Sequence, residues 1–442
     1  MPGLPAAWGP IGGKMQPSYR APYLARVLVP RLPFFYGWVV LGCVCLAGFA
    51  RQGPAVAVLS IFLVPMTSEF GWSRMAIAGA VSGGGLLAAF VSPLIGQVLD
   101  RRGARLILCC AVLGTGLSTM ALSLVHSLAV FYLLFCFARL NWAGPFELGL
   151  YGALNNWFVA RRAVAASIAT LAQTSGLVVL PLIAQYAMQG GNWRDGWVAV
   201  GATVLIVGFV PTFLLLVRTP EDVGLLPDRR PGATATTTTA PAEPRFSRAA
   251  ALRTPAFWLL SFYTMLVYPV QAGVSLHQAP HLIERGLTSA AAATVIAVFS
   301  AMTAVSSFGI GFLPRRWPVR YGLLAGALAM SAGSFALLAV DSLASACAAG
   351  GLFGMGVGAM LTLIPVAWAD YFGRESFGAI RSLALSGQVV AQAIGPVLSG
   401  ALRDWSGTYT DSLVVFGVLA ALAVGAAFVA RPAHPPLLSS RA

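Results

Sequence analysis

Arg51 lies near the centre of an otherwise apolar stretch, residues 37–64. An arginine at the centre of a membrane span costs roughly 2.5–3.5 kcal/mol on insertion scales, so its side chain must face protein, water or an opposite charge. The guanidinium fork matches the two oxygens of a carboxylate. We therefore interpret Arg51 as a carboxylate clamp. The alternative is a buried structural ion pair or a side chain that extends to the membrane surface.

The residues that follow Arg51 predict a bend in the same stretch. They are Gln52, Gly53 and Pro54. Proline has no backbone N–H and its ring clashes with the preceding turn, so it kinks or breaks a helix. We expect a bent helix with a guanidinium near its bend.

A second apolar stretch, residues 128–154, carries Arg139 and Glu147. Eight residues on a straight helix separate two side chains by about 80° and about 12 Å, so these two cannot pair directly. Each must find a partner elsewhere, and Glu147 is expected to meet the first or fifth span. A low dielectric raises the proton affinity of a carboxylate and a nearby guanidinium lowers it. We predict that Arg139 binds substrate and that Glu147 couples protons; the alternative is a salt bridge that holds the helices together.

Polar residues in the second half are further candidates for substrate binding. Gln388 and Gln392 are one helical turn apart and share a face. The stretch 256–278 carries Tyr263, Tyr268 and Gln271. Polar side chains at membrane depth usually line a cavity or bridge helices. We expect all five to line a substrate cavity.

These residues belong to a chain that has too few charged residues to cover a water-exposed surface. It is 58% hydrophobic and 10% charged, whereas soluble proteins carry about 25% charged residues. Stretches of about 20 apolar residues span a bilayer core of roughly 30 Å. We predict an all-α membrane protein with twelve transmembrane helices near residues 37–64, 75–99, 105–125, 128–154, 164–188, 196–217, 256–278, 289–312, 320–340, 343–369, 380–401 and 411–430.

The formal charge of +14 reflects topology rather than nucleic-acid binding. Of the 28 Lys and Arg residues, Arg51 and Arg139 lie inside spans and four lie in segments of one side: Arg74, Arg194, Arg285 and Arg403. The other 22 fall on alternate connections and the two tails. This bias places both termini in the cytoplasm.

We predict five segments along the chain. Residues 1–36 form a cytoplasmic tail, 37–218 a six-helix bundle, 219–253 a flexible cytoplasmic linker, 254–431 a second six-helix bundle and 432–442 a cytoplasmic tail. The linker contains the Thr-rich run 231–241, which cannot bury apolar surface. The six cysteines lie in apolar stretches without metal-ligand spacing. We expect no metal, no cofactor and no enzyme activity.

The two halves repeat each other. A shift of 215 residues places Pro65, Glu69 and Gly71 on Pro280, Glu284 and Gly286. The same shift places Gly96, Arg101 and Arg105 on Gly311, Arg316 and Arg320, and Pro181 on Pro396. Parallel repeats about an axis normal to the membrane are a known transporter plan, with the site between them.

The connection between the second and third spans carries the most specific motif. Residues 96–105 read Gly-Gln-Val-Leu-Asp-Arg-Arg-Gly-Ala-Arg. They resemble the loop motif of the major facilitator superfamily, Gly-x-x-x-Asp-Arg-x-Gly-x-Arg. Such a charge cluster can latch neighbouring helices and release them as the bundles rock. The resemblance assigns a conformational latch to Gly96, Asp100, Arg101, Gly103 and Arg105; in the second half Arg315 replaces the aspartate.

Shorter motifs resemble the bacterial monocarboxylate and oxalate–formate branch of that superfamily. They are Phe-Tyr-Gly-Trp at 35–38, Glu-Phe-Gly-Trp-Ser-Arg at 69–74, Trp-Phe-Val-Ala-Arg-Arg at 157–162, Asn-Trp-Arg at 192–194 and Pro-Glu-Asp-Val-Gly-Leu-Leu-Pro at 220–227. Arg139 also corresponds to an arginine common in the fourth span of proton-coupled members. The resemblance implies a secondary transporter of small organic anions, by proton symport or exchange.

The chain differs from that branch in the charged residues of two spans, and this difference changes where we expect the anion to bind. Its anion-selective members carry charged residues in spans 8 and 11, whereas residues 289–312 have none and the eleventh span has only Arg381 at its cytoplasmic edge. Anion recognition is then expected in the first half. Alternatives are a proton-driven exporter of amphipathic compounds and a non-transporting sensor. The expected partners are protons, a small organic anion and lipid, for a monomer in a bacterial inner membrane.

Overall fold

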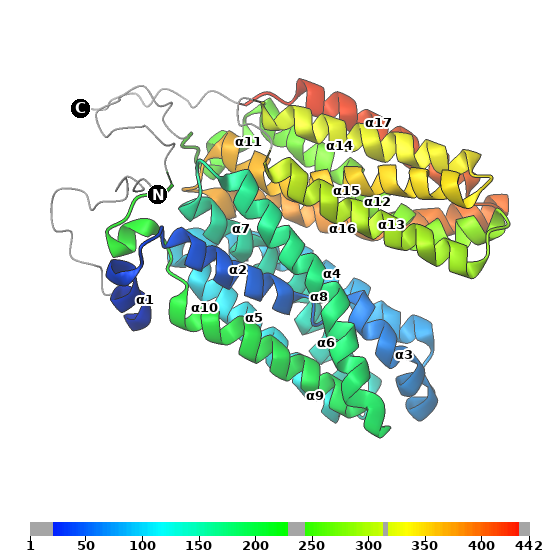
Figure 1. Cartoon of the computed structure of the whole chain (residues 1–442), viewed down its shortest axis with the longest axis horizontal. Coiled ribbons are helices and arrows are strands. Elements are labelled where there is room, and N and C mark those ends of the chain that lie inside the picture. The colour runs from blue at the N-terminus through cyan, green and yellow to red at the C-terminus, as the bar shows by residue number, and fades with distance from the viewer. Residues whose placement is uncertain (1–20, 229–243, 313–316, 433–442) are drawn as a thin grey trace, which may run out of the picture. The chain divides into compact units, whose positions relative to one another are not determined.

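A computed structural model describes residues 21–228, 244–312 and 317–432. All regular secondary structure in these ranges is helical, and twelve of the helical spans are long and apolar enough to cross a membrane (Figure 1). The chain divides into two compact units, and residues Ala166–Leu171 in the middle of one span fall with the second. The predicted all-α membrane fold is confirmed.

Unit 1 contains the first six spans. Its helices are α1 (Tyr23–Leu28), α2 (Gly37–Arg51), α3 (Val56–Phe70), α4 (Arg74–Arg102), α5 (Ala104–Ala121), α6 (Leu128–Ala143), α7 (Pro145–Trp157), α8 (Arg162–Ala187), α9 (Trp193–Thr203) and α10 (Val210–Leu215). A π-helical segment, Val204–Phe209, joins α9 to α10. The first span therefore consists of α2 and α3, and the fourth consists of α6 and α7.

Two breaks interrupt these spans, and only one of them was predicted. The first span stops at Arg51 and resumes at Val56, around Pro54. The fourth span breaks at Gly144, ahead of Pro145 at the first position of α7. Proline is well placed at the start of a helix, where its missing N–H leaves no bond unmade. The straight helix expected between Arg139 and Glu147 was wrong, because Gly144-Pro145 divides it.

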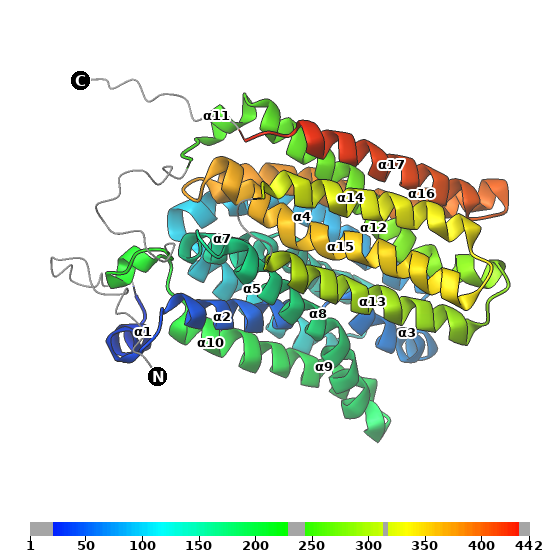
Figure 2. The same cartoon turned by 45° about the horizontal axis from the view of Figure 1, so that its top comes forward.

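Unit 2 contains the other six spans. Its helices are α11 (Arg248–Leu252), α12 (Pro255–Glu284), α13 (Ser289–Gly311), α14 (Val319–Ala336), α15 (Leu343–Phe372), α16 (Phe377–Ser406) and α17 (Thr410–Val429). Within it α13 and α14 pack against α15, and α12 packs against α16 and α17 (Figure 2). Unit 1 uses the equivalent pairs, with α4 and α5 against α6. The pairs α13–α15 and α14–α15 of unit 2 thus recur in unit 1 as α4–α6 and α5–α6.

The repeat is also visible at the ends of the first and seventh spans. Gly71 and Gly286 both adopt positive φ, at 69° and 91°, where glycine is unstrained. Two residues earlier, Glu69 pairs with Arg194 at 2.7 Å and Glu284 pairs with Arg403 at 2.9 Å. The offset of 215 residues therefore corresponds to matching helix ends and matching glutamates, and each glutamate pairs with an arginine of its own unit.

The start of the linker is ordered against unit 1. After a short 3₁₀ turn, Pro220–Val223, the chain reaches Asp228, which is 3% exposed. Its carboxylate accepts hydrogen bonds from the backbone N–H groups of Val159, Ala160 and Arg161. The expectation of a flexible linker over all of 219–253 was wrong for this segment, because these amides bind the carboxylate. The run 231–241, Arg315 and most of the two tails lie outside the described residues.

Candidate functional site

The breaks in the first and fourth spans lie side by side and are joined by reciprocal hydrogen bonds. The Arg51 Nε donates to the backbone carbonyl of Trp142 at 2.9 Å, just before the break at Gly144. Conversely, Arg139 Nη1 donates to the carbonyl of Pro54 at 3.4 Å. Breaking a helix frees carbonyl groups that need donors in a membrane. Each arginine supplies such a donor to the other span.

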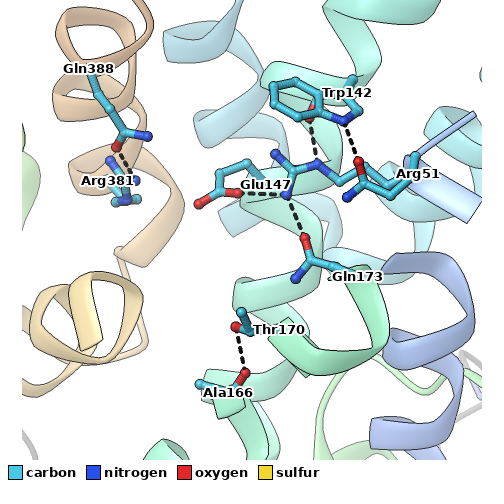
Figure 3. A network of polar contacts seen from close by, with 9 residues as sticks. Arg51, Trp142, Glu147, Ala166, Thr170, Gln173, Arg381 and Gln388 are labelled. Carbon is cyan, nitrogen blue, oxygen red and sulfur yellow. Dashed lines mark hydrogen bonds and ion pairs between the residues drawn. The ribbon is translucent and has the colours of Figure 1, made fainter. Parts of the chain in front are cut away.

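The Arg51 guanidinium points into unit 1 and meets three helices (Figure 3). Its Nη1 lies 2.8 Å from Glu147 Oε2 on α7 and 2.7 Å from Gln173 Oε1 on α8. Arg51 is 7% exposed and Glu147 is 8% exposed. Burial in a low dielectric strengthens such a pair relative to a surface salt bridge. Glu147 thus contacts the first span, one of the two spans expected to supply its partner.

Arg139 shares an aromatic neighbour with Arg51 but not its counter-ion. The Cζ atoms of Arg51 and Arg139 lie 4.6 and 4.1 Å from the centroid of the Trp142 ring. Arg139 is 9% exposed, and the described part of the chain places no carboxylate within ion-pair distance of it. Its Nε also has no hydrogen-bond partner there. Arg139 is therefore a buried cation whose charge no carboxylate of the described residues compensates, a costly arrangement in a protein interior.

The position of Glu147 follows from the break at Gly144. Glu147 lies in the first turn of α7, where the helix dipole favours a negative charge. Together Arg51, Arg139 and Glu147 carry a net formal charge of +1. The geometry therefore combines an internal ion pair with an adjacent cation that lacks an anion.

Two members of the cluster were not found from the sequence. Trp142 is three residues after Arg139 and so lies on the same face of α6, which was the available signal. Its indole Nε1 donates to Gln52 Oε1 at 3.1 Å. Gln173 carried no comparable signal, because only tertiary packing brings α8 to Arg51.

The candidates of unit 2 form two separate pairs. Gln388 Oε1 accepts a hydrogen bond from Arg381 Nη2 at 2.5 Å, and the Arg381 guanidinium lies 5.8 Å from the Trp368 ring. One turn along α16, Gln392 Nε2 donates to Gln271 Oε1 on α12 at 3.3 Å. These glutamines bridge polar groups within unit 2.

Tyr263 and Tyr268 are buried, at 0% and 5% exposed. The Tyr263 hydroxyl donates to the carbonyl of Leu323 on α14 at 2.9 Å. In this structure the Tyr263 hydroxyl is thus used in a contact between α12 and α14, and the role of Tyr263 in substrate binding stays a prediction. Tyr268 remains a candidate on the same helix.

The predicted latch lies where α4 meets α5. Gly103 joins the two helices with a φ of 86°, and a Cβ there would lie 2.4 Å from Arg218 Cγ. Arg218 Nη2 donates to the carbonyl of Asp100 at 3.2 Å, and Arg105 Nη2 donates to the carbonyl of Phe213 at 2.8 Å. Gly96 is buried and Arg101 exposed, both on α4. Arg101 lies in the last turn of α4.

Comparison with known proteins gives a match to one family over most of the chain, and relatives that are about a quarter identical in sequence. A profile described as the Major Facilitator Superfamily matches residues 40–313 and 273–442. Monocarboxylate transporter 11 of Homo sapiens is 26% identical over 429 residues, covering 87% of this chain and 80% of that protein. The Mus musculus protein of the same name is 25% identical and covers 86% of this chain and 84% of its own length. Monocarboxylate transporter 12-B of Danio rerio is 25% identical, with 86% and 84% covered.

Solved structures share the fold at low sequence identity. The proton:xylose symporter XylE aligns with a TM-score of 0.72 and 13% identity, over 90% of this chain and 96% of that one. The human organic anion transporter MFSD10 aligns with a TM-score of 0.65 and 14% identity, over 88% and 99%. At this identity the comparison shows a common fold.

Proposed function

The chain belongs to the major facilitator superfamily, and from this premise we propose that it carries small organic anions across the membrane by alternating access. The buried guanidinium of Arg139, which has no carboxylate partner among the described residues, is the observation that supports an anionic substrate. The relatives named as monocarboxylate transporters support the same class. Arg139 and Arg51 would hold the substrate carboxylate, and Glu147 would respond to protons.

Both coupling modes use the same ion pair. In symport, protonation of Glu147 releases Arg51 from its internal partner and leaves its guanidinium for the substrate. In exchange, one carboxylate replaces another beside Arg139 while Glu147 remains ionised. The positive-inside pattern supports cytoplasmic termini. A single Lys among 28 basic residues, with heavy Ala and Gly use, favours a bacterial inner membrane.

Uptake by proteoliposomes tests the proposal. Purified protein should accumulate labelled L-lactate or pyruvate, and Arg139→Gln should reduce the initial rate by about thirtyfold or more, because removal of a buried charge partner costs about 2 kcal/mol or more. Arg194→Gln is the matched control, since it removes an arginine of unit 1 whose partner Glu69 lies at the end of α3. Extrusion of an amphipathic dye driven by a pH gradient, with no uptake of any organic acid, would instead establish the exporter.

A further inference from the structure

We propose that Glu147 is an internal carboxylate that limits the substrate to a single negative charge, so that the site selects monocarboxylates and rejects dicarboxylates of similar size. This inference rests on the function proposed above and adds the valence of the substrate. It assigns Glu147 a role in specificity, apart from any role in proton coupling.

The geometry provides two neighbouring positions for a carboxylate. Both guanidiniums lie against the ring of Trp142, with Cζ-to-centroid distances of 4.6 Å for Arg51 and 4.1 Å for Arg139. Glu147 fills the position at Arg51, where Oε2 and Nη1 are 2.8 Å apart. The position at Arg139 has no protein carboxylate among the described residues. One position is therefore left for substrate.

The formal charge of Arg51, Arg139 and Glu147 then determines how many negative charges the substrate can carry. With Glu147 ionised, one bound carboxylate brings the formal charge of Arg51, Arg139 and Glu147 to zero. The second carboxylate of a dianion would add an uncompensated charge beside Glu147, in a region where like charges repel strongly. Without the charge of Glu147, the two arginines carry a charge of +2 and match a dianion.

The other partners of Arg51 do not alter this count. Gln173 Oε1 and the carbonyl of Trp142 are neutral acceptors, at 2.7 and 2.9 Å. They keep the Arg51 guanidinium in place when Glu147 is replaced. The substitution Glu147→Gln thus removes the negative charge and keeps a side chain of about the same size and shape.

The experiment compares two three-carbon inhibitors, propionate and malonate, above neutral pH where both malonate carboxyls are ionised. Proteoliposomes preloaded with unlabelled pyruvate exchange it for labelled pyruvate without a pH gradient, so proton coupling does not enter. The wild-type protein should be inhibited better by propionate. In Glu147→Gln the ratio of the two inhibition constants should shift toward malonate by about tenfold or more.

A double variant separates charge from damage to the fold. Arg51→Gln combined with Glu147→Gln removes the pair together and leaves Arg139 as the single charge, so the preference should return to propionate. Glu147→Asp should keep the wild-type ratio. Glu69→Gln is the matched control, because it removes the carboxylate of the Glu69–Arg194 pair in the same unit; it too should keep the wild-type ratio.

The results distinguish this inference from the proposed function. If wild-type protein exchanges no organic anion, the proposed function fails. If wild-type protein exchanges pyruvate but Glu147→Gln keeps the wild-type ratio of inhibition constants, the valence inference alone is overturned. The same holds if Glu147→Gln is inactive while the double variant exchanges pyruvate and is inhibited better by malonate. A malonate preference in the single variant that reverts in the double variant establishes it.

Discussion

Arg51 and Arg139 are two like charges held against one indole ring. The negative face of the Trp142 ring stabilises each guanidinium, an effect worth about 2 kcal/mol or more for a desolvated cation. The Nε1 group of the ring is fixed by Gln52. This arrangement explains how a second cation is tolerated beside a single carboxylate. The neighbouring residues thus stabilise a guanidinium, that of Arg139, for which the described part of the chain supplies no carboxylate.

Glu147 is the residue on which proton coupling is expected to depend. In wild-type proteoliposomes, uptake of labelled lactate should rise as the external medium is acidified, because protonation frees Arg51 for the substrate. In Glu147→Gln the rate should no longer change with external pH. Glu284→Gln, which removes the carboxylate of the Glu284–Arg403 pair in unit 2, should keep the wild-type pH profile. Uptake by Glu147→Gln that retains the wild-type pH dependence would exclude Glu147 as the coupling group.

At the level of elements, hydrogen bonds in unit 1 join the two broken spans to each other. Others join the start of the linker to the end of α7 and the residues that follow it. The segment after α10 is held by Trp157, whose Nε1 donates to the carbonyl of Val217 at 3.1 Å, and by the backbone N–H of Asp228, which donates to the carbonyl of Trp157 at 3.1 Å. Arg218 from the same segment packs on Gly103. The linker start therefore supports the turn between α4 and α5.

Asp228 is the residue on which this support is expected to depend. Asp228→Ala leaves three backbone N–H groups at 159–161 without their acceptor, so the protein should lose about 1–3 kcal/mol of stability. Asp228→Asn keeps an acceptor oxygen and should lose less. The measurement is the thermal unfolding midpoint of the purified protein. Asp404→Ala, at an exposed position, is the control, and an equal midpoint for the two alanine variants would contradict the role of Asp228.

For the whole molecule, the distribution of arginine predicts which ends face the cytoplasm. Ala249 lies in α11, near the end of the linker, and Thr408 lies between the last two spans; both are exposed. A membrane-impermeant maleimide applied to intact cells should label Thr408→Cys and should label Ala249→Cys only after the membrane is opened. Wild-type protein, with its six native cysteines, is the background. The reverse pattern would show that the termini are outside.

Composition and periodicity were sufficient for the twelve spans, because the number of apolar residues needed to cross a bilayer is a local property. Pro54 also predicted its break, since proline acts within its own turn. For Arg51 and Glu147 the sequence predicted that each needs a partner, because a charge within a span is costly. It did not predict that they pair with each other, because 96 residues separate them.

Tertiary structure decided which polar residues meet. It directed the Tyr263 hydroxyl to a carbonyl of α14, and it brought Gln173 to Arg51. It also placed Asp228 against the amides at 159–161, within a linker that reads as polar and unstructured. A sequence states which groups need partners, because charge and hydrogen-bonding capacity belong to single residues. The choice of partner depends on which helix faces lie together, and that is set by packing between spans far apart in the chain.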